Sequence, residues 1–169
     1  MNIAVKPLAP AAPSLRDAMR LVAGGVSVVT VGTGEDRTGL TVTSAVSLSI
    51  DVPTMLVSVN RTASAWPILQ KHRHFCVNFL TDAQQPVADR FAGKGGLKGA
   101  ARYDGAQWQG LVTGALALQG ALAAVDCRVS EFIERNSHVI VLGTVEAIRL
   151  GHGQPLVYGQ GCYGVFAAA

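Results

Sequence analysis

Hydroxyl side chains recur at every second residue in the segment 39–50, which reads GLTVTSAVSLSI. A β-strand turns successive side chains to opposite faces. The pattern therefore predicts one strand with a buried apolar face and a second face of hydroxyls, which donate and accept hydrogen bonds without carrying charge. Such a face contacts either solvent or a polar, uncharged part of a ligand. The odd positions are Thr41, Thr43, Ala45, Ser47 and Ser49.

A basic, glycine-rich segment lies further along the chain. Arg90, Lys94, Lys98 and Arg102 recur every four residues, with no acidic residue among them. Helical spacing would place these cations in one stripe, but each of the intervening glycines disfavours a helix by about 1 kcal/mol. We therefore predict a mobile basic loop. It is either a solvated surface loop or an electrostatic flap over a phosphate-bearing ligand.

Several motifs that carry well-known chemistry are absent. The sequence contains no GxGxxG after a strand, no P-loop, no HExxH and no GxSxG, so a nucleotide cofactor would have to bind without a Rossmann unit. His72 and His74 form an HxH at a predicted helix-to-strand junction, and we predict no metal site there. Cys76, Cys127 and Cys162 each lie in an apolar run without a CxxC, which predicts buried, reduced thiols.

The composition indicates a single domain with a covered surface. Of the 169 residues, 49% are hydrophobic and only 15% are charged, so we expect a second subunit to cover part of the exterior. The net charge of +3 suits anionic small molecules, and the 6% aromatic content argues against a nucleic-acid partner. No signal peptide pattern is present, and the most apolar window is too short to span a membrane. We expect a cytoplasmic protein without membrane contact.

The elements that must position these residues are mostly strands. We predict a flexible N-terminal arm over 1–13 and one domain over 14–169. Ser14 and Asp17 form a capping-box pattern at the first helix, and Ser64 stands at the N-cap of the second. Tight turns and the lack of βαβ alternation favour an antiparallel barrel with short peripheral helices. The predicted helices are 14–23, 64–72 and 82–93, and the longer predicted strands are 26–31, 39–50, 54–59, 74–80, 121–135 and 137–150.

Five segments together resemble a known family. GLTVTSAVSLSIDVP, SVNRTASAWPIL, FCVNFLTDAQQPVADRFAG, SHVIVLGTVEAI and PLVYGQGCYG occur in this order. They resemble the flavin reductase-like family, in particular the small reductase components of two-component flavin monooxygenases such as 4-hydroxyphenylacetate 3-monooxygenase. The resemblance runs from about Leu15 to Phe166. It implies a mainly β, FMN-binding split barrel with Greek-key topology, a homodimer, and reduction of FMN or FAD by NADH or NADPH.

The resemblance also implies roles for individual residues. The strand segment would line the flavin, with Val42 in place of the usual alanine. Ser64 at a helix N-cap would hold the flavin phosphate or serve as a plain cap. Arg90 would pair with the phosphate or be a surface cation, and His138 would face the nicotinamide or be structural. The implied site residues are Thr41, Val42, Thr43, Ser44, Ser47, Asn60, Ser64, Arg90, Phe91, His138 and Tyr158.

The activity implied by the resemblance is NAD(P)H-dependent flavin reduction. Hydride passes from nicotinamide C4 to flavin N5, and the protein aligns the two rings without acid–base chemistry. The reduced flavin would diffuse to a separate oxygenase component. Two alternatives remain open at this point. One is an FMN-retaining electron carrier, or a reductase of a corrinoid or ferric complex. The other is a non-enzymatic split-barrel protein that binds flavin or haem.

Overall fold

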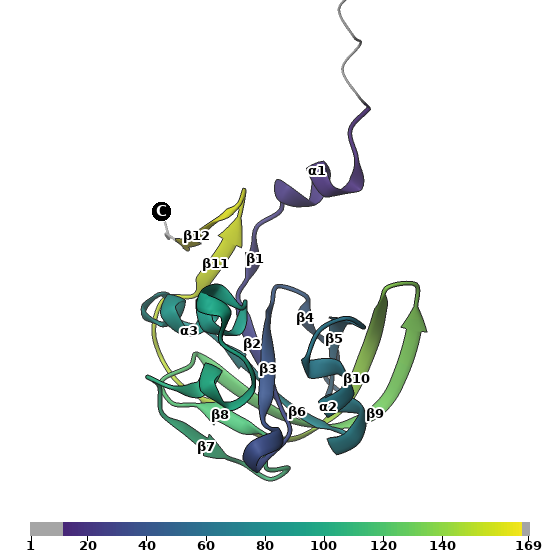
Figure 1. Cartoon of the computed structure of the whole chain (residues 1–169), viewed down its shortest axis with the longest axis vertical. Helices are drawn as coiled ribbons and strands as arrows, with labels where there is room; N and C mark the ends of the chain where they lie inside the picture. The colour runs from purple at the N-terminus through teal and green to yellow at the C-terminus, as the bar shows by residue number, and fades with distance from the viewer. Residues whose placement is uncertain (1–11, 167–169) are drawn as a thin grey trace, which may run out of the picture.

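A curved sheet of seven antiparallel strands forms the body of the molecule (Figure 1). The computed structural model describes residues 12–166. The strand order is β3-β2-β6-β9-β10-β5-β4, so the two edge strands follow one another in the chain, and the barrel is split between them. The predicted mainly β split barrel is confirmed. The strands are β2 (Ser27–Val31), β3 (Thr38–Val42), β4 (Ala45–Ser49), β5 (Thr54–Asn60), β6 (His74–Phe79), β9 (Ala123–Arg135) and β10 (His138–Leu150).

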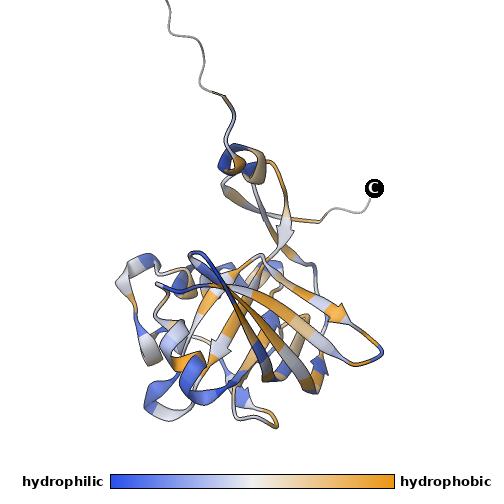
Figure 2. Ribbon diagram, turned by 90° about the vertical axis from the view of Figure 1, so that its right-hand side faces the viewer, coloured by the Kyte–Doolittle hydropathy of each residue, from blue (hydrophilic) through white to orange (hydrophobic). Residues whose placement is uncertain are grey.

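A smaller sheet and the first helix project from one end of the barrel, as Figures 1 and 2 show. This sheet has the order β1-β11-β12, with β1 (Gly24–Gly25), β11 (Leu156–Gly159) and β12 (Cys162–Val165). The predicted capping box of α1 (Leu15–Arg20) is confirmed, since Ser14 and Asp17 bond reciprocally. The predicted arm over 1–13 lies outside the described residues except for its last two. The remaining elements are α2 (Ala65–His72), α3 (Gln85–Phe91), β7 (Trp108–Gly110), β8 (Leu116–Leu118), and the 3₁₀ turns η1 (Gly34–Asp36), η2 (Asp82–Gln84), η3 (Lys94–Gly96) and η4 (Gly99–Tyr103).

Two apolar clusters hold the barrel and its cover together. Inside the barrel, alternate residues of β5 and β10, such as Val57 and Val141, pack with Phe75 of β6. Outside it, Phe91 of α3 packs between Tyr103 and Trp108, with ring centroids 5.0 and 5.5 Å away. Hydrophobic residues accordingly concentrate along the strands in Figure 2. These two clusters fix α3 against β3, which forms one wall of the site described below.

The segment 39–50 is not one strand, so that prediction is wrong. β3 ends at Val42 and β4 begins at Ala45, with a bend at Thr43 and Ser44 between them. The bend carries the chain from one edge of the sheet to the other. It also exchanges the faces of the odd-numbered residues. Thr41 points outward and donates its hydroxyl to the Ala88 carbonyl of α3 at 2.6 Å, whereas Ala45 packs on the barrel core.

The even-numbered apolar residues of β4 are consequently exposed. Val46 pairs with Leu56 on the outer face and is 51% exposed. Leu48, in a bulge of the strand, is 55% exposed, and Ile50 in the following turn is 83% exposed. We call Val46, Leu48 and Ile50 the β4 apolar surface. Exposed apolar surfaces of this kind are typical of contact sites for other molecules.

One further prediction needs correction. Cys76 and Cys127 are buried as predicted, but Cys162 is exposed on β12. The basic segment contains two 3₁₀ turns, and Arg102 donates hydrogen bonds to the carbonyl groups of Gly39 and Leu97. Arg102 therefore anchors this segment to the barrel instead of facing a ligand. Among residues 12–166, no helix is long and apolar enough to cross a membrane.

Candidate functional site

A cavity of about 680 Å³ lies between β3, α3 and the β11–β12 hairpin. Its volume falls within the range of small-molecule sites, roughly 300–1,000 Å³. Four of the residues predicted from the sequence line it, namely Thr41, Val42, Thr43 and Tyr158. The structure thus brings the first half of the hydroxyl-rich segment to the same place as the C-terminal hairpin. The lining also includes Val26, Gln85, Ala92, Lys94, Gly161, Cys162 and Tyr163.

The β3 wall of the cavity offers polar groups next to apolar surface. Thr41 is tied to α3 by its hydrogen bond to Ala88, so its position is set by the core beneath. Thr43 is exposed in the bend, beyond the last ladder pair of β3, which joins Val42 to Ser27. Its hydroxyl and backbone are therefore placed to contact a ligand in the cavity.

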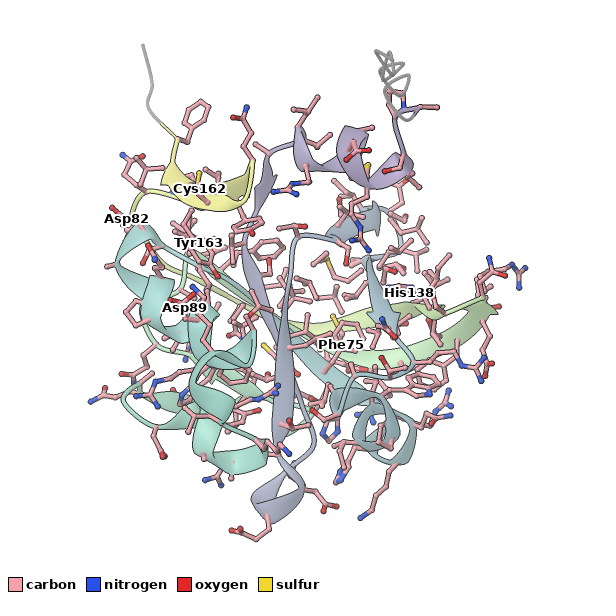
Figure 3. All side chains as sticks on the ribbon, turned by 45° about the horizontal axis from the view of Figure 1, so that its top comes forward. Phe75, Asp82, Asp89, His138, Cys162 and Tyr163 are labelled. Atoms are coloured by element: carbon pink, nitrogen blue, oxygen red, sulfur yellow. The ribbon has the colours of Figure 1, made fainter. Side chains whose placement is uncertain are left out.

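The opposite wall carries a cation and two aromatic rings. Lys94 Nζ lies 2.7 Å from Asp89 Oδ1 and 5.4 Å from the ring centroid of Tyr163. Tyr158 and Tyr163 pack edge to face, with centroids 5.1 Å apart. Burial raises the pKa of Tyr163 to about 12, helped by the negative charge of Asp89, so this phenol stays neutral near pH 7. Figure 3 shows Tyr163 and Asp89 on the same side of the molecule.

These features fit a planar, polar aromatic ring with an anionic substituent. Aromatic side chains pack against such a ring, hydroxyl and amide groups bond its edge, and a cation balances negative charge. Residues 19–167 match the family model described as flavin reductase like domain. The chain belongs to the flavin reductase-like family. The family predicted from the five sequence segments is therefore confirmed.

Three known members illustrate the similarity. The chain is 36% identical over 135 residues to the FMN reductase (NADH) RutF of Escherichia coli O157:H7 (strain EC4115 / EHEC), covering 80% of this chain and 81% of that protein. BorF, the flavin reductase component of a bacterial two-component tryptophan halogenase, is 30% identical with a TM-score of 0.83, covering 92% and 98% of the two chains. The Streptomyces globisporus C-1027 NADH:FAD oxidoreductase SgcE6, solved with NAD and FAD fragments, is 28% identical with a TM-score of 0.82, covering 90% and 91%.

A second group of predicted residues lies beyond the Thr43–Ser44 bend of this flavin reductase-like domain and does not line the cavity. Ser44 donates its hydroxyl to the Ser58 carbonyl at 3.2 Å. Ser47 is opposite the buried Met55, which places its side chain on the core face of the sheet at the open edge of the barrel.

Asn60, Ser64 and His138 lie near one end of β5 and β10. Asn60 and His138 are direct register partners, and Asn60 accepts hydrogen bonds from the backbone and hydroxyl of Thr62, both at 2.9 Å. Ser64 occupies the N-cap of α2 but makes no capping bond, so its exposed hydroxyl is available. His138 is exposed while Val139 is buried, as strand alternation predicts. Figure 3 shows His138 on the opposite side of the molecule from Tyr163.

Arg90 and Phe91 have other surroundings. The guanidinium of Arg90 lies 3.3 Å from the position of a Cβ added to Gly105, and Arg90 does not line the cavity. Phe91 is 2% exposed and belongs to the aromatic cluster beneath α3, so its side chain has no surface for a ligand. We therefore assign Phe91 to the core and not to the ligand contact that the family resemblance implies.

Sequence reasoning missed part of the cavity lining. Tyr163, Cys162 and Gln85 were not among the predicted residues, and Lys94 was noted only as part of the basic segment. One signal for Tyr163 was present in the sequence. The GQG between Tyr158 and Cys162 permits a two-residue hairpin turn, and such a turn sets Tyr158 directly opposite Tyr163, as observed. No local pattern in the sequence indicates that Lys94 lies beside Tyr163 in the cavity.

Proposed function

We propose that this protein is an NAD(P)H:flavin oxidoreductase that uses FMN or FAD as its electron acceptor. The observation that carries the proposal is the cavity in which Thr41–Thr43 face Lys94, Tyr158 and Tyr163. Flavin bound there supplies an N5 atom that accepts a hydride from C4 of reduced nicotinamide. The chain's own contribution is alignment of the two rings, which lowers the barrier without an acid or base.

Within this site we assign separate tasks to the residues. Thr41, Val42 and Thr43 border the ring system, and their backbone and hydroxyl groups bond its polar edge. Tyr158 packs against it from the hairpin. Lys94 supplies positive charge close to the ring, which favours the additional negative charge that a flavin carries after reduction. Its ion pair with Asp89 holds the ammonium group in place.

The second group of residues extends the proposed site around the bend. Asn60 and Ser64 hold the flavin phosphate, because the exposed Ser64 hydroxyl makes no capping bond and can donate to a phosphate oxygen. Ser44 or Ser47 contacts the flavin where it passes β4. We leave His138 out of this site, because it lies on the opposite side of the molecule from Tyr163. Phe91 is left out of the site because its side chain is buried in the aromatic cluster beneath α3, and Arg90 stays a proposed partner of the phosphate.

We propose that the reduced flavin serves a separate oxygenase component; BorF is likewise the flavin reductase component of a two-component system, a tryptophan halogenase. The cavity is open at the protein surface, so a reduced flavin can leave it. We also propose that the protein acts in the cytoplasm, where NAD(P)H is supplied. An electron carrier or a reductase of another acceptor is not favoured by the relatives, which are flavin reductases.

We also propose that the protein is a homodimer. The β4 apolar surface and apolar residues of α1, such as Leu15, are exposed in the single chain. A stable homodimer buries about 2,000 Å² or more of mainly apolar surface. Light scattering should therefore report twice the 17.6 kDa chain mass. Leu48→Asp should shift the protein toward a monomer, and a wild-type monomer at micromolar concentration would contradict the proposal.

The decisive experiment measures NADH and NADPH oxidation without oxygen, with and without added FMN, FAD or riboflavin. We expect consumption of NAD(P)H that depends on added flavin, with matching bleaching of the flavin absorbance near its visible maximum. The spectrum of the purified protein is recorded beside it. A yellow protein whose turnover is indifferent to added flavin would contradict this reading and favour an electron carrier.

A further inference from the structure

A second cavity adjoins the proposed flavin site. Its volume is about 510 Å³, and it shares Thr43, Tyr158 and Gly161 with the first cavity, so the two cavities are adjacent. Its far wall is α1, which contributes Arg16 and Arg20. None of the residues that we assign to the flavin site lies on α1. The second cavity therefore opens from the ring-binding region toward a separate set of side chains.

The β11–β12 hairpin holds α1 in this position. The turn at Gln160 and Gly161 has positive φ at both residues, +52° and +83°, as expected for a tight two-residue hairpin turn. The backbone N–H of Gln160 donates to the carbonyl of Arg20 at 2.8 Å. Tyr158 also pairs with Gly24 just after the helix. Helix α1 is thus attached to the β11–β12 hairpin, which also forms one wall of the proposed flavin site.

The charge of the second cavity is positive. Arg16 and Arg20 are one helical turn apart, which places them on the same face of α1. Among residues 12–166 neither has an ion-pair partner, and the cavity lining contains no acidic residue. The nearby carboxylate of Asp17 is occupied by the hydrogen bonds of the Ser14 cap. Two guanidinium groups without partners favour a phosphate, which they bind in bidentate geometry.

We propose that Arg16 and Arg20 bind the diphosphate of the nicotinamide dinucleotide that donates hydride to the flavin. This inference rests on the proposed function, because a hydride donor must reach a flavin in the first cavity. Tyr158 and Thr43 form the boundary between the two cavities, so a dinucleotide crosses there with its nicotinamide toward the flavin. The diphosphate then carries the negative charge that the two arginines balance.

The test compares Arg16→Gln, Arg20→Gln and the double variant with wild type. With FMN saturating, each single change should raise the KM for NADH by about tenfold or more, the scale of one charge-assisted hydrogen bond, and leave kcat nearly unchanged. The Kd of FMN should not change. The inhibition constant of ADP against NADH should rise by a similar factor. Arg128→Gln is the matched control, since Arg128 is an exposed arginine paired with Glu146 that lines neither cavity.

Other results would overturn the assignment. An unchanged KM for NADH in the double variant would remove the arginines from the donor site. If the variants bind FAD more weakly but FMN and NADH normally, the two arginines bind the diphosphate of FAD. If the variants bind FMN more weakly, the arginines bind the flavin phosphate. Calorimetry of ADP binding needs no turnover. If wild type oxidises no NADH but binds ADP in an Arg16- and Arg20-dependent way, the proposed function fails while the anion site stands.

Discussion

Phe91 lies directly against Gly39, at the point where β3 passes over α3. A Cβ added to Gly39 would stand 2.7 Å from Cε1 of the Phe91 ring and 2.5 Å from the carbonyl oxygen of Val29. The ring cannot move aside, because Tyr103 and Trp108 pack on it. The glycine that opens the hydroxyl-rich segment is therefore required by packing. It lets β3 approach α3 closely enough to form one wall of the cavity.

Gly39→Ala should accordingly destabilise the protein by about 1–3 kcal/mol, the usual cost of overpacking a core. It should also weaken flavin binding, because β3 must shift away from α3. Urea unfolding measures the first effect and fluorescence titration the second. Gly25→Ala is the control, since an added Cβ there meets nothing within 4 Å. Equal stability of the two variants would show that α3 moves freely.

Lys94→Gln should slow flavin reduction and weaken binding of reduced flavin by about tenfold or more. The physical reason is the loss of a positive charge at the wall of the cavity, a contribution of about 1.5–3 kcal/mol for a charged hydrogen bond. Anaerobic titration with oxidised and reduced FMN separates the two states. Lys98→Gln removes an equal charge from an exposed position outside the cavity and should have no effect. Equal losses in both lysine variants would indicate only a long-range charge effect.

Ser64→Ala should weaken FMN binding by about 1 kcal/mol, the net value of one hydrogen bond. Because the Ser64 hydroxyl makes no capping bond, the substitution should leave the stability of α2 nearly unchanged. Riboflavin lacks the phosphate, so its affinity should be the same for wild type and variant. A matching loss of riboflavin affinity would mean that the substitution disturbs the fold and not a phosphate contact.

His138→Ala should leave the KM for NAD(P)H, kcat/KM and flavin affinity nearly unchanged, because a nicotinamide that enters between Tyr158 and Thr43 lies on the other side of the molecule. The side chain is exposed at the start of β10, so its removal leaves no cavity in the core. Steady-state kinetics at saturating flavin provide the measurement. His152→Ala, another exposed histidine, serves as control. A rise of about tenfold in the KM for NAD(P)H with unchanged flavin affinity would instead place His138 at the nicotinamide, as the family resemblance implies.

Acid should destabilise the fold through His74. Burial lowers the pKa of His74 below its ordinary value of 6.5, and the charge of His72 lowers it further; Arg128 adds to this effect and Asp126 opposes it. The folded chain therefore binds fewer protons than the unfolded chain, so stability present above pH 6.5 is lost as the pH falls. The melting temperature should drop between pH 7.5 and about 5. His74→Gln should flatten that slope, and His152→Gln should leave it unchanged.

Local patterns determined much of this structure from the sequence alone. Strand alternation identified Val139 as buried beside an exposed His138, and the Ser14–Asp17 spacing identified the start of the first helix. Both depend on neighbours within a few residues, so a linear pattern contains the necessary information. The five family segments identified the family in the same way, because each is a run of adjacent residues.

Tertiary structure decided what those patterns could not contain. The alternation of 39–50 continues without interruption in the sequence, yet the bend at Thr43 and Ser44 exchanges its faces, because the chain crosses there between the two edges of the sheet. The approach of Lys94 to Tyr163 and the exposure of Cys162 likewise depend on how the hairpin packs beside α3. Contacts between residues far apart in the chain set the direction of these side chains, and no spacing within either segment encodes them.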